Sequence, residues 1–309
     1  MAKAIREIYG ETLAELGNTM ENLVVLDADV AGSTKSALFK AAHPDRFFDM
    51  GIAEANMAAT AAGLATTGYV PFINTFAVFI TSASLLALRG QICYGNLNVK
   101  LGGAYAGMSD ARDGATHHSL EDMAILRALP NMKILSVSDA AETRWATRYA
   151  AQCSGPCYIR LSRDVLPDLY PQDHEFTFGK AETLREGKDA TIIATGLMVH
   201  NALKAAELLA AEGIEVTVLD MHTIKPIDAV AVLKAAAMGP VVTAEEHSII
   251  GGLGSAVAEI MAGAGCGGGL IRVGLQDTFS ETGDYASLQK KYGIDAESVA
   301  DAVKRSLKK

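Results

Sequence analysis

Short apolar runs alternate with helix-compatible segments along almost the whole chain, and this alternation restricts the fold more than any other feature. Strands that alternate with helices predict βαβ units and a parallel sheet. At about 150 residues per domain, a chain of 309 residues favours two domains. We therefore predict two α/β domains with parallel or mixed sheets. The expected strands lie at 23–29, 70–74, 99–103, 133–137, 157–161, 190–196, 216–220 and 240–244.

The alternation breaks between residues 167 and 178, where Pro, Asp, Tyr, Gln and His follow one another without any period. A segment of this kind is typical of an interdomain linker. We predict a first domain at 1–168, a linker at 169–183 and a second domain at 184–309. In the first domain, Asp139 is expected to cap a helix and Glu142 to close a capping box.

The charge balance excludes some classes of partner. The formal net charge is −9, whereas a nucleic-acid surface normally needs a basic stripe. No apolar run approaches the roughly 18 residues of a membrane span, and the first residues carry charges where a signal peptide is apolar. We expect a soluble, cytoplasmic protein with no nucleic-acid or membrane partner. Phosphorylated small molecules remain possible, because one or two arginines suffice to bind them.

Neither the cysteines nor the histidine pair has the spacing of a metal site. Cys153 and Cys157 lie four residues apart without a second pair, so reduced thiols are expected. His117 and His118 are adjacent and should point apart, which favours acid/base chemistry or substrate binding by one of them. No metal ligand is predicted on this chain.

Glu54 is an isolated carboxylate between a predicted strand and a helix of small residues. At the base of a packed interface, desolvation would favour partnership with a proton-carrying group. The alternative is a helix N-terminal carboxylate stabilised by the macrodipole. Phe76 and Phe79, three apart after a strand, are either core residues or a wall for a heteroaromatic ring.

Other polar residues gather where strands end. Ligands of open parallel sheets lie beyond the carboxyl ends of the strands. Long polar loops such as 107–118 are usually functional or mobile. Of the two arginines at 160 and 163, Arg163 is the better candidate for a phosphate or carboxylate. The glycine-rich turn at 251–254 could bind an anion, but we favour a structural or subunit-contact role. The strand-end residues are Asp27, Asp29, Ser33, Asn74 and Thr75.

These segments together resemble the carboxyl-terminal portion of the transketolase family of thiamine-diphosphate enzymes. The resemblance covers nearly the whole chain and implies a pyrimidine-binding domain followed by the family's C-terminal domain. Its markers are Asp27-Ala-Asp29 with Ser33, Met50-Gly-Ile-Ala-Glu54-Ala-Asn56, Phe72 to Phe79, Asp113-Gly-Ala-Thr-His117, Leu161-Ser162-Arg163, Met221 to Asp228 and Glu245 to Gly254.

The resemblance also implies roles. Glu54 would hydrogen-bond the aminopyrimidine nitrogen of thiamine diphosphate and promote the tautomer that takes the proton from the thiazolium carbon. Phe79 would stack on the pyrimidine, with Phe76 completing the pocket. The remaining matches line the thiazolium and substrate channel (Asp29, Ser33), meet a sugar hydroxyl (Asp113), contact the donor oxygen (His117) and hold the sugar phosphate (Arg163).

The family's diphosphate-binding module, with its Gly-Asp-Gly stretch and magnesium-binding Asn, has no match here. The resemblance therefore implies a split enzyme, in which a separate amino-terminal subunit supplies the magnesium and diphosphate contacts. The simplest closed assembly is α2β2. The chain departs from the family at Tyr105, Arg112 and Ser82, so a branched or less common sugar phosphate is a reasonable substrate hypothesis.

Three alternatives share parts of this pattern. The beta subunit of a 2-oxo acid dehydrogenase has the glutamate, the domain order and the need for a partner, but the loop at 113–117 and Arg163 fit sugar handling better. Deoxyxylulose-phosphate synthase normally carries all domains on one chain. A non-catalytic paralogue would keep only the fold and interface, and retention of Glu54, both phenylalanines and His117 argues against it.

Overall fold

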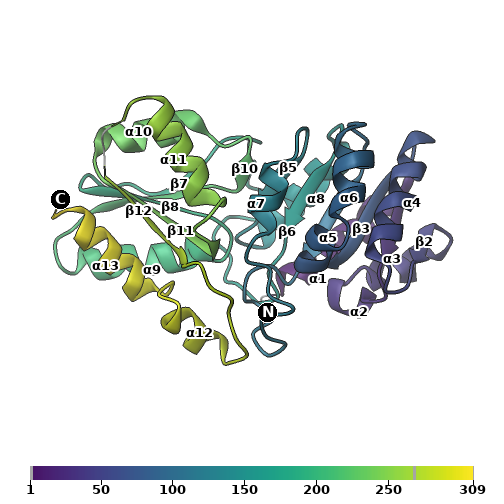
Figure 1. Cartoon of the computed structure of the whole chain (residues 1–309), viewed down its shortest axis with the longest axis horizontal. Helices are drawn as coiled ribbons and strands as arrows, with labels where there is room; N and C mark the ends of the chain where they lie inside the picture. The colour runs from purple at the N-terminus through teal and green to yellow at the C-terminus, as the bar shows by residue number, and fades with distance from the viewer. Residues whose placement is uncertain (1–2, 267–268, 309) are drawn as a thin grey trace.

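A computed structural model describes residues 3–266 and 269–308. The chain forms two sheets side by side, each covered by helices on both faces (Figure 1). The predicted α/β class is therefore confirmed. In the described ranges, no helix is both long and apolar enough to cross a membrane.

The first sheet has seven strands in the order β10-β5-β6-β4-β3-β1-β2. All its neighbours pair in parallel except β10, which runs antiparallel to β5. The strands are β1 (Leu23–Asp27), β2 (Phe47–Asp49), β3 (Val70–Phe76), β4 (Lys100–Ala104), β5 (Lys133–Ser136), β6 (Cys157–Arg160) and β10 (Thr223–Lys225).

Helices pack on the two faces of this sheet because their apolar sides are buried there. One core contains side chains of α1, α3 and α8, and another contains side chains of α4, η2 and α7. The helices are α1 (Ile5–Gly17), α2 (Ala31–Thr34), α3 (Ala37–Ala42), η1 (Pro44–Arg46), α4 (Glu54–Thr66), α5 (Ala77–Ser82), α6 (Leu85–Ala87), the π-helix η2 (Leu88–Cys93), α7 (Asp122–Arg127) and α8 (Ala140–Gln152).

The second sheet has five strands in the order β12-β11-β8-β9-β7, with only the β7–β9 pair antiparallel. Its strands are β7 (Glu182–Arg185), β8 (Ala190–Ala194), β9 (Val216–Asp220), β11 (Val241–Ser248) and β12 (Leu270–Leu275). Its helices are α9 (Met198–Ala210), α10 (Ala229–Met238), α11 (Leu253–Gly263), α12 (Tyr285–Lys291) and α13 (Ala296–Ser306).

The two halves of the chain pack against each other, which the predicted division into consecutive domains did not anticipate. Strand β10 comes from the predicted second domain but pairs with β5 of the first sheet. One continuous hydrophobic core includes Met123 and Leu126 of the first half together with Val232 and Val257 of the second. The junction between the halves is therefore a packed interface, and the loops that cross it are held from both sides.

The start of α8 shows where the capping prediction was partly wrong. The Asp139 side chain does cap the helix, accepting from Glu142 N at 2.8 Å. The Glu142 carboxylate does not accept from the backbone N of Asp139, however, as a capping box requires. It accepts instead from the backbone N and Oγ of Ser138 at 2.5 and 2.8 Å, because Ser138 lies beside a second buried carboxylate, Asp220.

Asp220 and Glu142 are fully buried and share one hydroxyl, so their protonation should affect stability. Ser138 Oγ lies 2.9 Å from Asp220 and has one proton to donate, while Tyr170 Oη donates to Asp220 at 2.9 Å. Burial raises the pKa of Asp220 to about 7 and that of Glu142 well above its usual range. An unfolded carboxyl titrates near pH ~4. The folded state thus keeps protons that the unfolded state loses, and stability falls as pH rises from about 4 to about 7.

Asp220→Asn should therefore raise Tm at pH 8 and leave it nearly unchanged at pH 5. Each 1 kcal/mol recovered corresponds to about 2 to 4 °C in a chain of this size. Thermal melts at the two pH values check this, with Asp301→Asn on an exposed position of α13 as the control. An equal gain at both pH values would contradict the raised pKa of this carboxyl.

Candidate active site at the carboxyl ends of the first sheet

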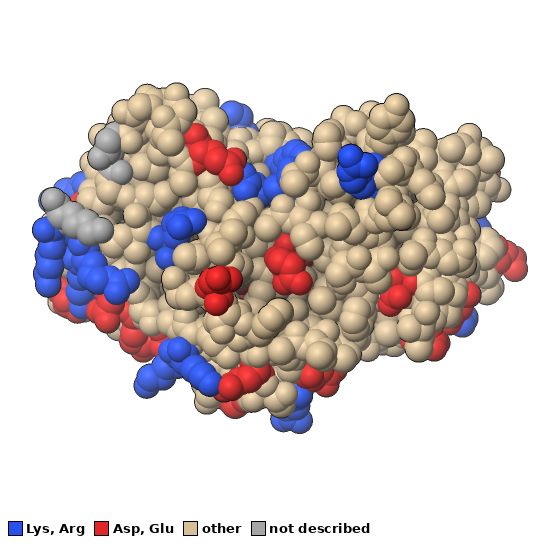
Figure 2. Space-filling model, viewed as in Figure 1, with Lys and Arg blue, Asp and Glu red and all other residues tan. Residues whose placement is uncertain are grey.

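Glu54 is the first residue of α4, directly after a turn that follows β2. The helix packs closely because its buried side is made of Met57, Ala58, Ala61 and Ala62. Glu54 itself is only half-buried in this chain, so the expected desolvation is not achieved within one chain. The neighbouring Ile52 side chain is 82% exposed. Figure 2 shows few charged side chains on the surface over α4, α5 and α6.

Four rings from three segments form an aromatic cluster, which we define as Phe76, Phe79, Tyr105 and His117. Phe76 ends β3 and Phe79 lies one turn into α5, so the strand-to-helix transition brings their ring centroids to 5.8 Å. Tyr105 stacks on Phe76 at 4.6 Å. His117 meets Phe79 edge-on at 5.4 Å and Phe76 at 6.0 Å. The structure thus brings two predicted cofactor residues and one predicted catalytic residue together.

The loop that carries Tyr105 and His117 is held by the second half of the chain. Glu246 of β11 accepts from Met108 N at 3.1 Å and from Tyr285 Oη at 2.6 Å. Gly107 has a φ of +68°, and a Cβ there would lie 2.2 Å from Glu246 Oε2, so only glycine fits. Burial raises the pKa of Glu246 to about 7. This carboxyl is a structural clamp at the junction.

The two adjacent histidines have different surroundings. His118 is buried, with Nε2 2.9 Å from Asp110 O and Nδ1 in contact with Ser280 Oγ, and burial lowers its pKa. His117 is half-buried and faces the aromatic cluster, with Nδ1 3.0 Å from Thr116 Oγ1. His118 therefore fixes the loop, and His117 is the one available for chemistry.

Two guanidinium groups lie against Tyr105. Arg163 lies 5.3 Å from the ring centroid and Arg6 of α1 lies 5.2 Å from it. Arg6 also donates to Tyr105 Oη at 2.5 Å and to Ser33 O at 3.0 Å. Sequence reasoning missed Arg6, because one basic residue in an amphipathic first helix gives no functional signal. The pair makes this edge of the sheet suitable for an anionic group.

Arg163 forms an ion pair with the buried Asp110, and its own side chain remains 40% exposed. Burial, then the nearby Asp113, raises the pKa of Asp110 to about 6, although Arg163 opposes the shift. Arg160, three residues earlier, points into the junction instead and pairs with Asp122 at 2.8 Å. Arg160 is the last residue of β6, and Arg163 lies beyond the strand end, the position for which it was preferred as the candidate ligand-binding arginine.

The remaining predicted residues lie in the segments that follow β1 and β4. Asp29 is exposed in the turn after β1 with a φ of +62°, Ser33 lies in α2, and Asp113 is exposed in the loop. In the ranges that the structure describes, no hydrogen bond joins Glu54 or Asp29 to the aromatic cluster. Asp27 is buried and accepts from Val30 N, Thr34 Oγ1 and Ser36 Oγ, so it builds the turn.

The glycine-rich turn has no room for an external anion. Glu245 accepts from Leu253 N at 2.7 Å and from Gly254 N at 2.8 Å, which places the chain's own carboxylate at the N-terminus of α11. A Cβ on Gly252 would lie 2.0 Å from Glu245 Oε2. The glycines are therefore explained by packing around an internal cap, in agreement with the structural reading.

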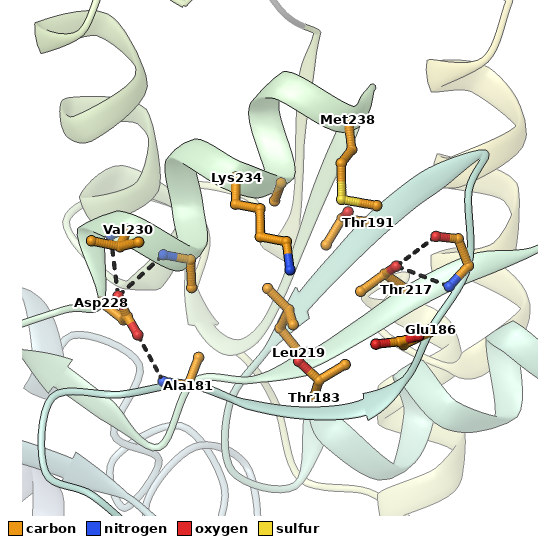
Figure 3. Close-up of a pocket in the computed structure, with 13 residues that line it drawn as sticks. Ala181, Thr183, Glu186, Thr191, Thr217, Leu219, Asp228, Val230, Lys234 and Met238 are labelled. Atoms are coloured by element: carbon orange, nitrogen blue, oxygen red, sulfur yellow. Dashed lines mark hydrogen bonds between the residues drawn. The ribbon is translucent and has the colours of Figure 1, made fainter.

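Two cavities differ in their relation to these residues. One of about 590 Å³ opens beside Arg163 and is also lined by Arg112, Ser109 and Tyr285. Another of about 460 Å³ lies between α10 and the second sheet, with Lys234 extending from α10 into it (Figure 3). The second cavity contains none of the predicted site residues, so the candidate site lies at the first sheet.

Comparisons with known proteins identify the family of the chain. Residues 1–168 match the transketolase pyrimidine-binding domain, and residues 179–299 match the transketolase C-terminal domain. A putative transketolase C-terminal section from Methanocaldococcus jannaschii is 45% identical over 99% of this chain and 97% of its own length. The 6-deoxy-6-sulfo-D-fructose transketolase subunit SqwH from Clostridium sp. is 42% identical over 96% of this chain and 92% of its own length.

A solved structure described as a split-gene transketolase, inactive β4 tetramer, superposes with a TM-score of 0.90. The two sequences are 45% identical, and the match covers 100% of this chain and 99% of the solved chain. The resemblance stated from the sequence is confirmed. The chain belongs to the transketolase family, and it carries the family's pyrimidine-binding and C-terminal domains.

Proposed function

We propose that this chain is the C-terminal subunit of a split transketolase that transfers a two-carbon ketol unit between sugar phosphates. A separate amino-terminal subunit would complete the enzyme by binding the diphosphate and magnesium, in an α2β2 assembly. The observation that carries the proposal is the aromatic cluster, because it places Phe76, Phe79 and His117 around one spot beside Arg163. The domain division at 1–168, 169–183 and 184–309 belongs to the same proposal.

The residues present fit the pyrimidine half of thiamine diphosphate. Phe79 is half-buried and Phe76 lies at its side, so the pair offers a flat apolar wall to a heteroaromatic ring. When bound, the cofactor supplies the nucleophilic carbon that the transfer needs. Glu54 would hold a proton at a ring nitrogen of the pyrimidine, and the two phenylalanines would orient that ring and exclude water. Asp29 and Ser33 would line the channel toward the substrate.

On the substrate side, His117 would hydrogen-bond the donor oxygen and Asp113 a sugar hydroxyl. Arg163 would bind the terminal anion of the sugar, with Arg6, which also lies against Tyr105, contributing positive charge. The sulfonated sugar in the name of the Clostridium relative is also an anion, so phosphate and sulfonate donors both deserve testing. Tyr105 would orient the two guanidinium groups.

The surface beside Glu54 supports a partner subunit. Ile52, Leu86 and Tyr94 are 82%, 84% and 88% exposed on the turn before α4, on α6 and directly after η2. Apolar side chains exposed to this degree on neighbouring elements are typical of an interface. A partner that covers them would also take Glu54 out of water, which this chain does not do by itself. The related β4 tetramer is described as inactive, which suits a need for another subunit.

Reconstitution tests the proposal. We expect the purified chain to show no two-carbon transfer with thiamine diphosphate, magnesium and xylulose 5-phosphate, and to become active when a subunit bearing the Gly-Asp-Gly stretch is added. Activity of the chain alone would exclude the split model. If the pair forms but transfers no unit from any phosphorylated or sulfonated ketose, the sugar-phosphate reading is wrong. Acylation of a lipoyl group would favour a 2-oxo acid dehydrogenase.

Arg163→Gln should raise the KM for a phosphorylated donor by about 10- to 100-fold, the equivalent of one charged hydrogen bond. The kcat should change little, because the arginine binds a group remote from the reacting carbon. Steady-state kinetics of the reconstituted pair check this, with an unphosphorylated ketose as the substrate control. The matched variant is Arg148→Gln, which removes a surface arginine paired with Glu15. Equal losses for both substrates would argue against a phosphate site at Arg163.

A further inference from the structure

Two cysteines and a buried lysine meet at the amino ends of β4 and β6, the end of the first sheet opposite to the aromatic cluster. We define this thiol cluster as Cys153, Cys157 and Lys100. Cys153 follows the last residue of α8, Cys157 begins β6, and Lys100 begins β4. None of the three has a part in the proposed transfer reaction.

Lys100 is fully buried without a carboxylate partner. Its Nζ donates to Cys153 O and Gly155 O at 2.7 Å each and to Asn98 Oδ1 at 2.6 Å. In the described part of the chain, no acidic side chain forms an ion pair with it. Burial lowers the pKa of Lys100, and a negative partner beside it favours the charged ammonium. The Cys153 sulfur, 3.6 Å from Nζ, is placed to be that partner as a thiolate.

The surroundings of Cys153 favour its thiolate form. Cys157 follows four residues later at the start of β6, in register with Lys100 and Lys133, and Lys133 adds a second positive charge, held by its hydrogen bond to Ser154 O at 2.6 Å. The neighbouring Cys157 thiol and the charges of Lys100 and Lys133 lower the pKa of Cys153, against its burial. Proximity to Cys153 and burial raise the pKa of Cys157. Tyr149, whose pKa is raised by burial and by these thiols, remains neutral.

The two cysteines also differ in their exposure to solvent. Cys153 is half-buried, whereas Cys157, four residues later, is fully buried. An accessible thiolate next to a second thiol is the arrangement of a peroxide-sensitive cysteine with its resolving partner. Cys93 is buried and Cys266 half-buried.

We propose that Cys153 is an oxidation-sensitive thiol of this protein and that Cys157 resolves its oxidised form as an intramolecular disulfide. In the first step the Cys153 thiolate attacks hydrogen peroxide; the O–O bond breaks, the sulfur becomes a sulfenic acid, and hydroxide leaves and is protonated to water. In the second step the Cys157 sulfur attacks the sulfenic sulfur, the S–O bond breaks, and a second water leaves with the Cys157 proton. The peroxide is reduced by the two electrons that the thiols lose. The disulfide removes the thiolate that faces Lys100.

Alkylation as a function of pH is the first test. The full chain is treated with limiting iodoacetamide, and the modified cysteines are identified by peptide mass spectrometry. We expect the midpoint for Cys153 to lie at least about one pH unit below the ordinary thiol value of about 8.5 and to return to it in urea. Lys133→Gln should raise the midpoint, because it removes one of the two positive charges. A native midpoint equal to that in urea would overturn the proposal.

Peroxide treatment is the second test. The wild-type chain should lose two hydrogen atoms and yield a peptide linked between Cys153 and Cys157. Cys157→Ser should stop at a sulfenic acid on Cys153 that dimedone traps, and Cys153→Ser should give neither product. Cys266→Ser is the matched control and should behave like the wild type. Preferential oxidation of Cys266, or an unlinked Cys153 in the wild type, would refute the assignment.

Discussion

Glu54→Gln is expected to lower two-carbon transfer by the reconstituted enzyme by about 10²- to 10⁴-fold, the range for loss of a positioned proton-transfer group. Glutamine keeps the size of the side chain and can still hydrogen-bond a ring nitrogen, but it cannot hold or release the proton. The measurement is kcat with saturating thiamine diphosphate, magnesium and ketose phosphate. The loss should fall on kcat more than on the KM of the sugar, because Glu54 would face the cofactor.

Two readouts besides activity keep this prediction specific. Size-exclusion chromatography should show the Glu54→Gln chain still assembled with its partner. The free energy of unfolding of the isolated chain should change by no more than about 0.3–1 kcal/mol, the usual contribution of a helix N-terminal carboxylate. Glu297→Gln, which alters an exposed first-turn glutamate of α13, is the matched control. Full activity of Glu54→Gln would favour the macrodipole role over the proton-transfer role. Loss of the complex would show that Glu54 is an interface residue only.

The main strands could be predicted because their residues are buried on both faces. Strands β1, β3 and β9 are buried at every position, so they read as continuous apolar runs. The missed strands β7 and β10 are only four and three residues long, and only the end of the three-residue β2 was recognised. Strand β12 was missed as well, and only its last three residues are buried. At an edge, pairing is decided by the neighbouring strand and not by the segment's own pattern.

The site could be predicted in part for a different reason. The spacing of Phe76 and Phe79 is local, so the sequence shows that the two rings are neighbours. The contact between His117 and these two rings joins segments about forty residues apart. It could be predicted only through the family resemblance. The positions of Arg6 and Glu246 were not predictable, because each acts through a contact with a distant part of the chain, at Tyr105 and Met108.

The acidic pair before the glycine-rich turn shows how orientation decides a role. Glu245 and Glu246 are neighbours on β11, so their side chains leave the strand on opposite faces. One caps α11 of its own half, and the other holds the first half's loop at Met108. In the sequence they are simply two adjacent carboxylates before the glycine-rich turn. Only the fold separates them.

Arg160→Ala is expected to destabilise the chain by about 3–5 kcal/mol, the usual result of removing one partner from a buried ion pair. The Arg160 and Asp122 side chains are 6% and 0% exposed, and Nε donates to Asp122 Oδ2 at 2.8 Å. Burial alone would raise the pKa of Asp122, but the charges of Arg160 and His247 hold it below its usual range. Without the arginine, Asp122 must be protonated or remain an unpaired buried charge. Urea unfolding at pH 7 measures the loss.

The effect should extend across the junction, because Arg160 Nη2 also donates to Glu246 O at 2.9 Å. Glu246 clamps the loop of His117, so Arg160→Ala should also speed proteolysis of that loop under native conditions. Arg148→Ala, which breaks the exposed pair with Glu15, should cost no more than about 1 kcal/mol and is the control. The double change Asp122→Leu with Arg160→Met should be less destabilising than Arg160→Ala, since it removes both charges. If the double variant is the less stable one, the pair contributes net stability beyond compensating its own burial.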